Sequence, residues 1–309
     1  MPYPIITLCG SYNMSKDWVL PCVNSWNKIS NIDHNHFHLI PDGHLNEDDA
    51  EKFRKMNFKV VSLEDQKKVD AFLENYPNLK KIRKNDLTWR KLLDTAILFS
   101  RYEKIILIDT DVLINGDITL PEGDFDIMYM REDIPAYRAN WKIVWQEQMV
   151  PALNAGLVIL DPKIIDFDYL EFITKKYLID CKDYWWTEQS AWSCLAGKSK
   201  RRMLFNGEEV RVLGGFHKRN TKQIKSNNYK YIGSNKIIEH FVDFKPLLTG
   251  SQIVHFAGLG KRWFKESLQY LSSEQSEFCE KILIGAYPEK KMSLIDKIMI
   301  SSRLYFKER

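Results

Sequence analysis

The feature that most constrains the fold is the segment KIILIDTD, residues 104–111, in which an unbroken apolar run ends in two aspartates one residue apart. The run does not alternate with polar residues, which is typical of a strand buried on both faces of a parallel sheet. Other apolar runs, at residues 4–9, 36–41 and 58–63, are separated by segments with helical spacing, such as residues 86–100. Strands that alternate with helices predict an α/β fold with a mostly parallel central sheet flanked by helices.

The rest of the sequence predicts one domain followed by a basic tail. The chain has 309 residues, 44% of them hydrophobic and 28% charged, which is the composition of a soluble globular protein with a full-sized core. It contains no repeat, low-complexity segment or linker, so we expect a single domain over residues 1–265 and a basic amphipathic helical tail over residues 266–309. Residues 281–309 contain seven basic and three acidic side chains, an excess that equals the formal net charge of +4.

The charge and the cysteines argue against several classes of protein. A net charge of only +4 is unlike that of a nucleic-acid-binding protein. The five cysteines are scattered and form no C-x-x-C pair, which argues against a zinc site or a disulfide framework and favours a reducing compartment. Because residues 1–8 are too short for a signal peptide and no apolar run approaches about 20 residues, we expect a cytoplasmic protein without a membrane span. The tail fits either peripheral contact with the inner face of a membrane or a helix packed on its own domain.

Asp109 and Asp111 flank Thr110 at the end of the predicted central strand. Acidic residues are common at strand ends as caps, so a D-x-D pattern alone does not define a site. In a parallel sheet, however, ligands bind beyond the carboxyl ends of the strands, and side chains at positions i and i+2 point the same way. Two carboxylates can therefore converge on one divalent cation, which can bridge to phosphate oxygens.

Two later motifs would complete such a site. The segment IVHFAGLGKRW, residues 253–263, places His255 at a strand end, ahead of two glycines and Lys261. Glycine lets backbone N–H groups approach a phosphate and the lysine adds a mobile cation, so we interpret this segment as a third metal ligand beside a diphosphate. The segment LNAGLVILD, residues 153–161, carries Asn154 and two small residues that leave room close to the backbone.

In this order, the three motifs resemble those of family 8 glycosyltransferases, which include bacterial lipooligosaccharide galactosyltransferases and glycogenin. The resemblance spans about residues 5–263. It implies a Rossmann-like GT-A fold and transfer of a sugar from a nucleotide sugar, usually a UDP-sugar, to a carbohydrate or glycolipid acceptor. It also implies retention at the anomeric carbon, Mn²⁺ or Mg²⁺ as the cofactor, and a role in surface polysaccharide or lipopolysaccharide assembly.

The resemblance further implies which residues bind the donor. The metal ligands would be Asp109, Asp111 and His255. The diphosphate would be bound by Lys261 and by the backbone of Gly258 and Gly260. The base of the nucleotide would be contacted by Thr7, Leu8 and Tyr12, on and just after the first strand. The donor sugar and the phosphates would be contacted by Arg90, Lys91, Asp94, Thr110, Asn154 and Ala155.

The catalytic residues that the resemblance implies are Gln189 and Glu188, in the segment WTEQSAW, together with Asp111. Gln189 would lie near the β-face of the anomeric carbon. The sequence departs from the family pattern where Glu188 replaces an aspartate, Arg262 replaces a proline and Ser193 replaces an asparagine. These departures bear on the sugar and acceptor side of the site and leave the metal ligands unchanged.

Aromatic residues near this segment leave other functions open. Trp185 and Trp186 offer flat apolar faces on which a sugar ring can stack, although large aromatics mostly fill cores. A sugar nucleotidyltransferase would share the α/β plan and the paired aspartates, but the loop after the first strand is poor in glycine and basic residues. A non-catalytic carbohydrate-binding protein would explain the aromatics but not the combination of D-x-D, histidine and lysine.

Overall fold

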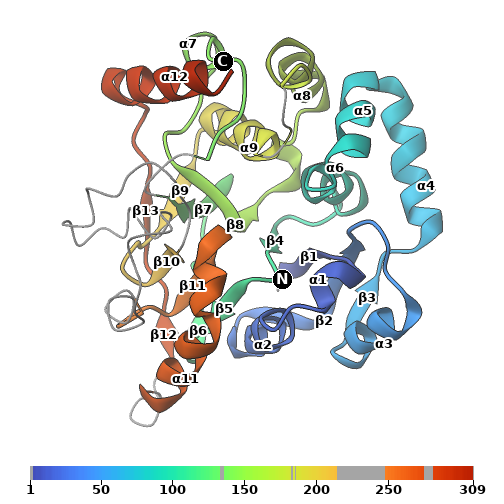
Figure 1. Cartoon of the computed structure of the whole chain (residues 1–309), viewed down its shortest axis with the longest axis vertical. Coiled ribbons are helices and arrows are strands. Elements are labelled where there is room, and N and C mark those ends of the chain that lie inside the picture. Colours follow the sequence, from blue (N-terminus) through green and yellow to red (C-terminus); the bar gives the residue numbers. More distant parts are fainter. Residues whose placement is uncertain are drawn as a thin grey trace.

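The computed structural model describes residues 3–132, 136–181, 184, 186–213, 248–274 and 281–308. An eight-stranded sheet lies at the centre of this part of the chain, with helices around it (Figure 1). Four of the seven neighbouring strand pairs are parallel, which agrees with the predicted mostly parallel sheet. In spatial order the strands are β13 (Ala286–Pro288), β9 (Arg202–Phe205), β7 (Ile127–Arg131), β8 (Leu153–Leu160), β4 (Ile105–Ile108), β1 (Tyr3–Cys9), β2 (Ile32–Pro41) and β3 (Phe58–Val60).

Smaller sheets and the helices complete the fold. One small sheet holds β10 (Val210–Leu213), β11 (Ile253–Phe256) and β5 (Val112–Ile114), and another holds β12 (Ile282–Leu283) and β6 (Ile118–Thr119). The α-helices of the described ranges are α1 (Ser11–Met14), α2 (Val19–Ser25), α3 (Glu47–Lys55), α4 (Leu63–Phe72), α5 (Pro77–Asn85), α6 (Trp89–Leu98), α7 (Ile143–Gln146), α8 (Phe167–Ile173), α9 (Thr187–Lys198), α11 (Phe264–Glu274) and α12 (Leu294–Glu308).

The central strand β4 is buried on both faces, as its unbroken apolar run predicts. Ile105 and Leu107 belong to a core that also contains the apolar faces of α6 and α9. Ile106 and Ile108 point the other way, into a second core shared with α2 and α3. The alternation of side chains along a strand therefore divides one continuous apolar run between two cores, and α/β layering follows from it.

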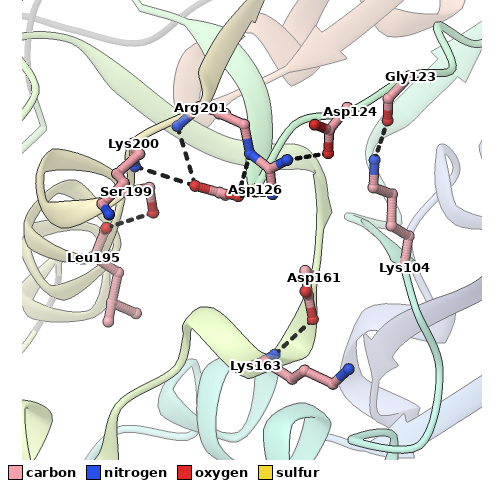
Figure 2. Close-up of polar contacts among 10 residues, drawn as sticks. All are labelled: Lys104, Gly123, Asp124, Asp126, Asp161, Lys163, Leu195, Ser199, Lys200 and Arg201. Atoms are coloured by element: carbon pink, nitrogen blue, oxygen red, sulfur yellow. Dashed lines mark hydrogen bonds and ion pairs between the residues drawn. The ribbon is translucent and has the colours of Figure 1, made fainter.

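A group of ion pairs lies at the edge of the sheet where β7 and β9 begin (Figure 2). Asp126, which precedes β7, accepts hydrogen bonds from the backbone N–H groups of Lys200 (3.1 Å) and Arg201 (3.0 Å) and from the guanidinium Nε of Arg201 (2.9 Å). The same guanidinium pairs with Asp124. Since a strand rises about 3.3 Å per residue, these pairs lie roughly 17 Å from the residues that follow β7.

The tail forms a helix, as expected, and one side of this helix packs on the domain. In α12, Ile300 and Leu304 are buried in the same core as α6 and α9. The hydroxyl of Ser301 accepts a hydrogen bond from the indole of Trp145 (2.9 Å), and the ring of Tyr305 lies edge-on to that of Trp141. The opposite side of α12 exposes five apolar side chains: Leu294, Ile295, Ile298, Met299 and Phe306.

Across the described ranges, none of the helices has both the length and the apolar composition to span a bilayer. The boundary expected at residue 265 stays a prediction. α11 begins at Phe264, and β13 from the expected tail is the edge strand of the central sheet. The tail is thus joined to the domain by backbone pairing as well as by side-chain packing.

His38, in the buried part of β2, makes stability depend on pH. Its Nε2 has no hydrogen-bond partner among the described residues, its ring lies 4.7 Å from that of Phe99, and burial lowers its pKa to about 4. The unfolded chain takes up this proton near pH 6.5, whereas the folded protein does not until about pH 4, so stability is lost as pH falls through this window.

We therefore expect the free energy of unfolding to fall by about 2 kcal/mol between pH 6.5 and 4 through His38 alone. The full shift in the pKa of His38 would imply a larger fall, but the ring retains some contact with solvent. Urea unfolding of the wild type and of His38→Gln at both pH values measures this. The variant should lose less stability over the window than the wild type. Parallel pH profiles of the two proteins would contradict the assignment.

Candidate active site

The D-x-D residues lie in the turn between β4 and β5, next to two other strands. The backbone N–H of Asp109 donates to the carbonyl of Gly156 in β8 (2.8 Å). β5 pairs antiparallel with β11 in a register that sets His255 opposite Val112, the residue after Asp111. Strand pairing alone therefore brings the histidine to the aspartates from a distant part of the sequence.

The three residues that the sequence assigns to a metal lie together. One ligand atom each from Asp109, Asp111 and His255 lies within 4.8 Å of the others. Oδ1 of Asp111 lies 3.2 Å from Nε2 of His255. Two carboxylates and one imidazole form a donor set that suits Mn²⁺ and also accepts Mg²⁺.

Each aspartate is also paired with a lysine. The Nζ of Lys261 lies 2.6 Å from Oδ2 of Asp111, and the Nζ of Lys91 lies 2.6 Å from Oδ1 of Asp109 and also contacts the carbonyl of Ala155. Burial favours the neutral form of Asp111, but His255 and Lys261 outweigh it and hold its pKa below the ordinary value. Asp111 is therefore charged at neutral pH, and the ammonium groups of Lys261 and Lys91 beside the two aspartates can also meet a phosphate group.

Gly156 is required by the ring of His255. A Cβ at position 156 would lie 2.3 Å from Nδ1 and 2.5 Å from Cε1 of that ring, far closer than real atoms approach. The imidazole thus lies directly against the backbone of β8. This contact gives a physical reason for the glycine in the N-A-G motif.

Gly156→Ala should therefore displace His255 and weaken binding of Mn²⁺ by about 10- to 100-fold, as loss of a ligand's support typically does. Titration calorimetry with Mn²⁺ measures this. Gly207→Ala is the matched control, because a Cβ there would meet no atom within 4 Å. Equal affinity of wild type and Gly156→Ala would contradict the place given to His255.

A buried carboxylate that the sequence did not predict joins two predicted residues. Oε2 of Glu132 accepts hydrogen bonds from Nδ2 of Asn154 (3.3 Å) and from Nε2 of Gln189 (3.1 Å). Asn154 in turn contacts His255, with 2.9 Å between Oδ1 and Nδ1. The surrounding sequence has no clear period, so the only signal for Glu132 is its position directly after β7, the strand beside β8.

α9 carries the residues predicted to be catalytic. Trp186, with a left-handed φ of 76°, directly precedes the helix, and Trp185 lies outside the described residues. Burial raises the pKa of Glu188 to about 8, an effect that the charge of Lys91 opposes, and its carboxyl group accepts from the indole N–H of Trp192. At pH 7 Glu188 is therefore mostly protonated, unlike Asp111.

The residues expected around the base lie on β1 and α1. Thr7 is buried in β1, and its Oγ1 has no hydrogen-bond partner in the part of the chain that the structure describes. Leu8 is half-buried, whereas Tyr12 is 77% exposed and has the Nζ of Lys16 4.1 Å from its ring centroid. Thr110 is buried between the two aspartates. Stacking of a base on Tyr12 stays a prediction.

Asp94 is less accessible than the predicted contact with the donor requires. Both of its carboxylate oxygens accept from Arg83, from Nε at 2.5 Å and from Nη2 at 2.8 Å, and the residue is 0% exposed. Its neighbour Arg90 donates to the carbonyl of Pro41 (2.9 Å). A contact between Asp94 and a donor would need the pair with Arg83 to open.

The loop after β11 is a 3₁₀ helix, Gly258–Trp263. Gly258 has a φ of 51°, in the left-handed region that glycine adopts without strain. The N–H of Gly260 donates to the carbonyl of Ala257 (2.9 Å), so it is engaged within the turn and is not free for a phosphate in this conformation. The turn directs Lys261 to Asp111, and this lysine is the part of the predicted diphosphate site that the structure brings to the metal ligands.

Comparison with known proteins identifies the class. Residues 9–164, just over half of the chain, match the model of glycosyl transferase family 8, and the chain belongs to this family. A comparison with curated protein sequences gave no match. Family membership confirms the resemblance inferred from the motifs and makes the protein a glycosyltransferase. It thereby argues against the two alternative functions, that of a sugar nucleotidyltransferase and that of a non-catalytic carbohydrate-binding protein.

Solved structures of glycosyltransferases are among the similar folds. The bifunctional glycosyltransferase WbbM is 13% identical, with 88% of this chain and 50% of that chain covered and a TM-score of 0.49, so this chain spans about half of its length. Mouse xyloside xylosyltransferase 1 is 11% identical, with 82% and 97% covered and a TM-score of 0.49. The galactosyltransferase LgtC in complex with donor and acceptor sugar analogs is 14% identical, with 87% and 95% covered and a TM-score of 0.46.

Proposed function

We propose that the protein transfers a sugar from a UDP-sugar to a carbohydrate or glycolipid acceptor, with retention at the anomeric carbon, in surface polysaccharide or lipopolysaccharide assembly. The observation that carries this proposal is the meeting of Asp109, Asp111 and His255 with Lys91 and Lys261. Acidic ligands with ammonium groups beside them suit a diphosphate bound together with a divalent cation.

The donor set fits Mn²⁺ or Mg²⁺, which Asp109, Asp111 and His255 would hold. When bound, such an ion neutralises negative charge that develops on a diphosphate leaving group. The fit rests on the chemistry of the three side chains and on the short distances between their ligand atoms.

The remaining side chains would orient the donor and stabilise the charge that develops on it. Lys261 would exchange its contact with Asp111 for a diphosphate oxygen. Protonated Glu188 would add no negative charge beside the phosphates, and the carbonyl oxygen of Gln189 would face the positive anomeric carbon. The acceptor hydroxyl attacks from the face that the diphosphate leaves. The glycosyl–phosphate bond breaks, the glycosidic bond forms, and a phosphate oxygen takes the hydroxyl proton.

The tail would bring the protein to its acceptor. We place the protein in the cytoplasm, peripheral on the inner face of a membrane, because α12 exposes an apolar side next to Lys290 and Lys291. Sedimentation with anionic phospholipid vesicles tests this. Ile298→Asp should reduce the bound fraction without changing turnover of a soluble acceptor, and equal binding by wild type and variant would contradict the membrane role.

The activity is tested by hydrolysis of a panel of nucleotide sugars, with Mn²⁺ and with EDTA, followed by release of nucleoside diphosphate. Release from one UDP-sugar that stops with EDTA would support the donor and the metal. Release that EDTA does not affect would contradict metal dependence, and release only from donors with another base would contradict the UDP-sugar. If no donor is hydrolysed, UDP binding with and without Mn²⁺ decides whether the diphosphate site exists.

A further inference from the structure

Glu132 lies where three parts of the candidate site meet. It follows β7, its backbone N–H donates to the carbonyl of Ala152 (2.8 Å), and it is 3% exposed. Its Oε2 accepts from the amides of Asn154 and Gln189, which come from β8 and α9. An ionised carboxylate only accepts hydrogen bonds, so each amide must turn its NH₂ group toward Glu132 and its oxygen elsewhere.

The orientation of Asn154 fixes the proton on His255. Oδ1 of Asn154 accepts from the backbone N–H of Gly156 (2.9 Å), which identifies this atom as the oxygen independently of Glu132. The same Oδ1 lies 2.9 Å from Nδ1 of His255, so that nitrogen must carry a hydrogen. Nε2 is then the nitrogen directed to Asp111, 3.2 Å from Oδ1, and it is the nitrogen through which the ring would bind a cation.

The orientation of Gln189 decides what α9 presents to a donor sugar. With Nε2 bound to Glu132, the oxygen of this amide is directed away from the carboxylate. A carbonyl oxygen stabilises a developing positive charge, whereas an NH₂ group in its place would oppose it. Glu132 therefore controls two atoms at once, one on the metal side of the site and one on the sugar side.

The C-terminal helix brings a positive charge toward the same carboxylate. Burial lowers the pKa of Arg303 in α12, and the charge of Glu132 opposes that effect. The packing of Ile300 and Leu304 into the core holds this part of α12 in place. Arg303 therefore attracts, from α12, the carboxylate that accepts from both amides.

We propose that Glu132 is a positioning residue that fixes the amide of Gln189 and, through Asn154, the tautomer of His255. The proposal rests on the metal and donor site of the proposed function. It assigns Glu132 no contact with the substrate, because its effect reaches the reaction only through the two amides.

Glu132→Leu removes the acceptor and keeps a buried side chain of similar size. We expect Mn²⁺ affinity to fall about 10- to 100-fold, as for other losses of support behind a ligand, and kcat to fall with it. Glu132→Gln, which keeps one acceptor oxygen, should recover most of both. Glu147→Leu is the matched control, because that carboxylate accepts from the hydroxyls of Tyr169 and Tyr177, away from the metal ligands.

The tautomer provides a readout that does not depend on activity. In ¹⁵N-labelled protein without metal, assigned with His255→Gln, the wild type should show a protonated Nδ1 on His255, and Glu132→Leu should show both tautomers. If Glu132→Leu does not fold, Glu132→Asp, with its carboxylate one methylene further back, should show the same changes in smaller measure. Wild-type Mn²⁺ affinity and an unchanged His255 signal in a folded variant would overturn the proposal.

These measurements separate the two proposals. If the wild type binds no Mn²⁺ and hydrolyses no nucleotide sugar, the proposed function fails, and the signals of His255 still report on Glu132. If the wild type is active and Glu132→Leu matches it in affinity, kcat and His255 signals, the positioning role fails and the proposed function stands.

Discussion

Asp111→Asn is expected to lower metal-dependent turnover by about 100- to 1,000-fold while the protein stays folded. Asp111 has an oxygen toward each of His255 and Lys261, and these two side chains hold its pKa below the ordinary value in a buried position. An amide at this position carries no charge for a divalent cation and cannot accept on its NH₂ side. The measurement is nucleoside diphosphate release against Mn²⁺ concentration, together with Mn²⁺ binding by calorimetry.

Asp126→Asn is the control for this variant. Asp126 is another carboxylate held by a basic side chain, that of Arg201 (Figure 2). It precedes β7, whereas Glu132 of the candidate site follows this strand. It should keep wild-type turnover and lose only stability. Undiminished metal-dependent turnover in Asp111→Asn, or an equal loss in Asp126→Asn, would rule out a specific metal site at the D-x-D turn.

Asp94→Leu is expected to lower the free energy of unfolding by about 3–5 kcal/mol, because it leaves a buried guanidinium without its main partner. Burial alone would lower the pKa of Arg83, but Asp94 and Asp70 more than offset it, so the guanidinium is held as a cation by these carboxylates. Adding Arg83→Met to Asp94→Leu should restore most of the stability, since no unpaired charge then remains. Urea unfolding followed by circular dichroism measures all three proteins.

The same variants decide the role of Asp94. The exposed pair of Arg54 and Glu47 is the control, and its removal should leave the stability almost unchanged, because solvent screens the two charges. If Asp94 contacts the donor, the stable double variant should still have a raised KM for the nucleotide sugar. If Asp94 is structural, the double variant should have the KM of the wild type. A fully stable Asp94→Leu protein would contradict the importance of the buried pair.

Prediction from the sequence succeeds best for residues whose place in the fold follows from a local pattern. β4 follows from its apolar run. Asp109 directly follows β4, Asp111 directly precedes β5 and His255 is the second-last residue of β11, so their meeting follows from the fold. The pattern does not reveal that β11 pairs antiparallel with β5 in a separate small sheet. That pairing depends on contacts between distant segments, which no spacing along the chain encodes.

The residues that the sequence missed or placed differently depend on partners from other elements. Glu132 stands in a segment without a clear period, and its role appears only when Asn154 and Gln189 are seen beside it. Asp94 lies on an amphipathic helix, where its burial depends on Arg83 from the preceding helix. In both cases a charged side chain is buried because it has a partner on another element. Its own position in the sequence does not reveal that partner.

The position of the last elements also bears on how the chain folds during synthesis. β13 supplies the edge strand beside β9, and α12 covers the core around α7, so both surfaces stay open until residues 286–308 have left the ribosome (Figure 1). An unpaired strand edge and an uncovered apolar surface favour aggregation of unfinished chains. The metal ligands and Lys261 are synthesised earlier, so the chemical groups of the site exist before the nascent chain is protected from self-association.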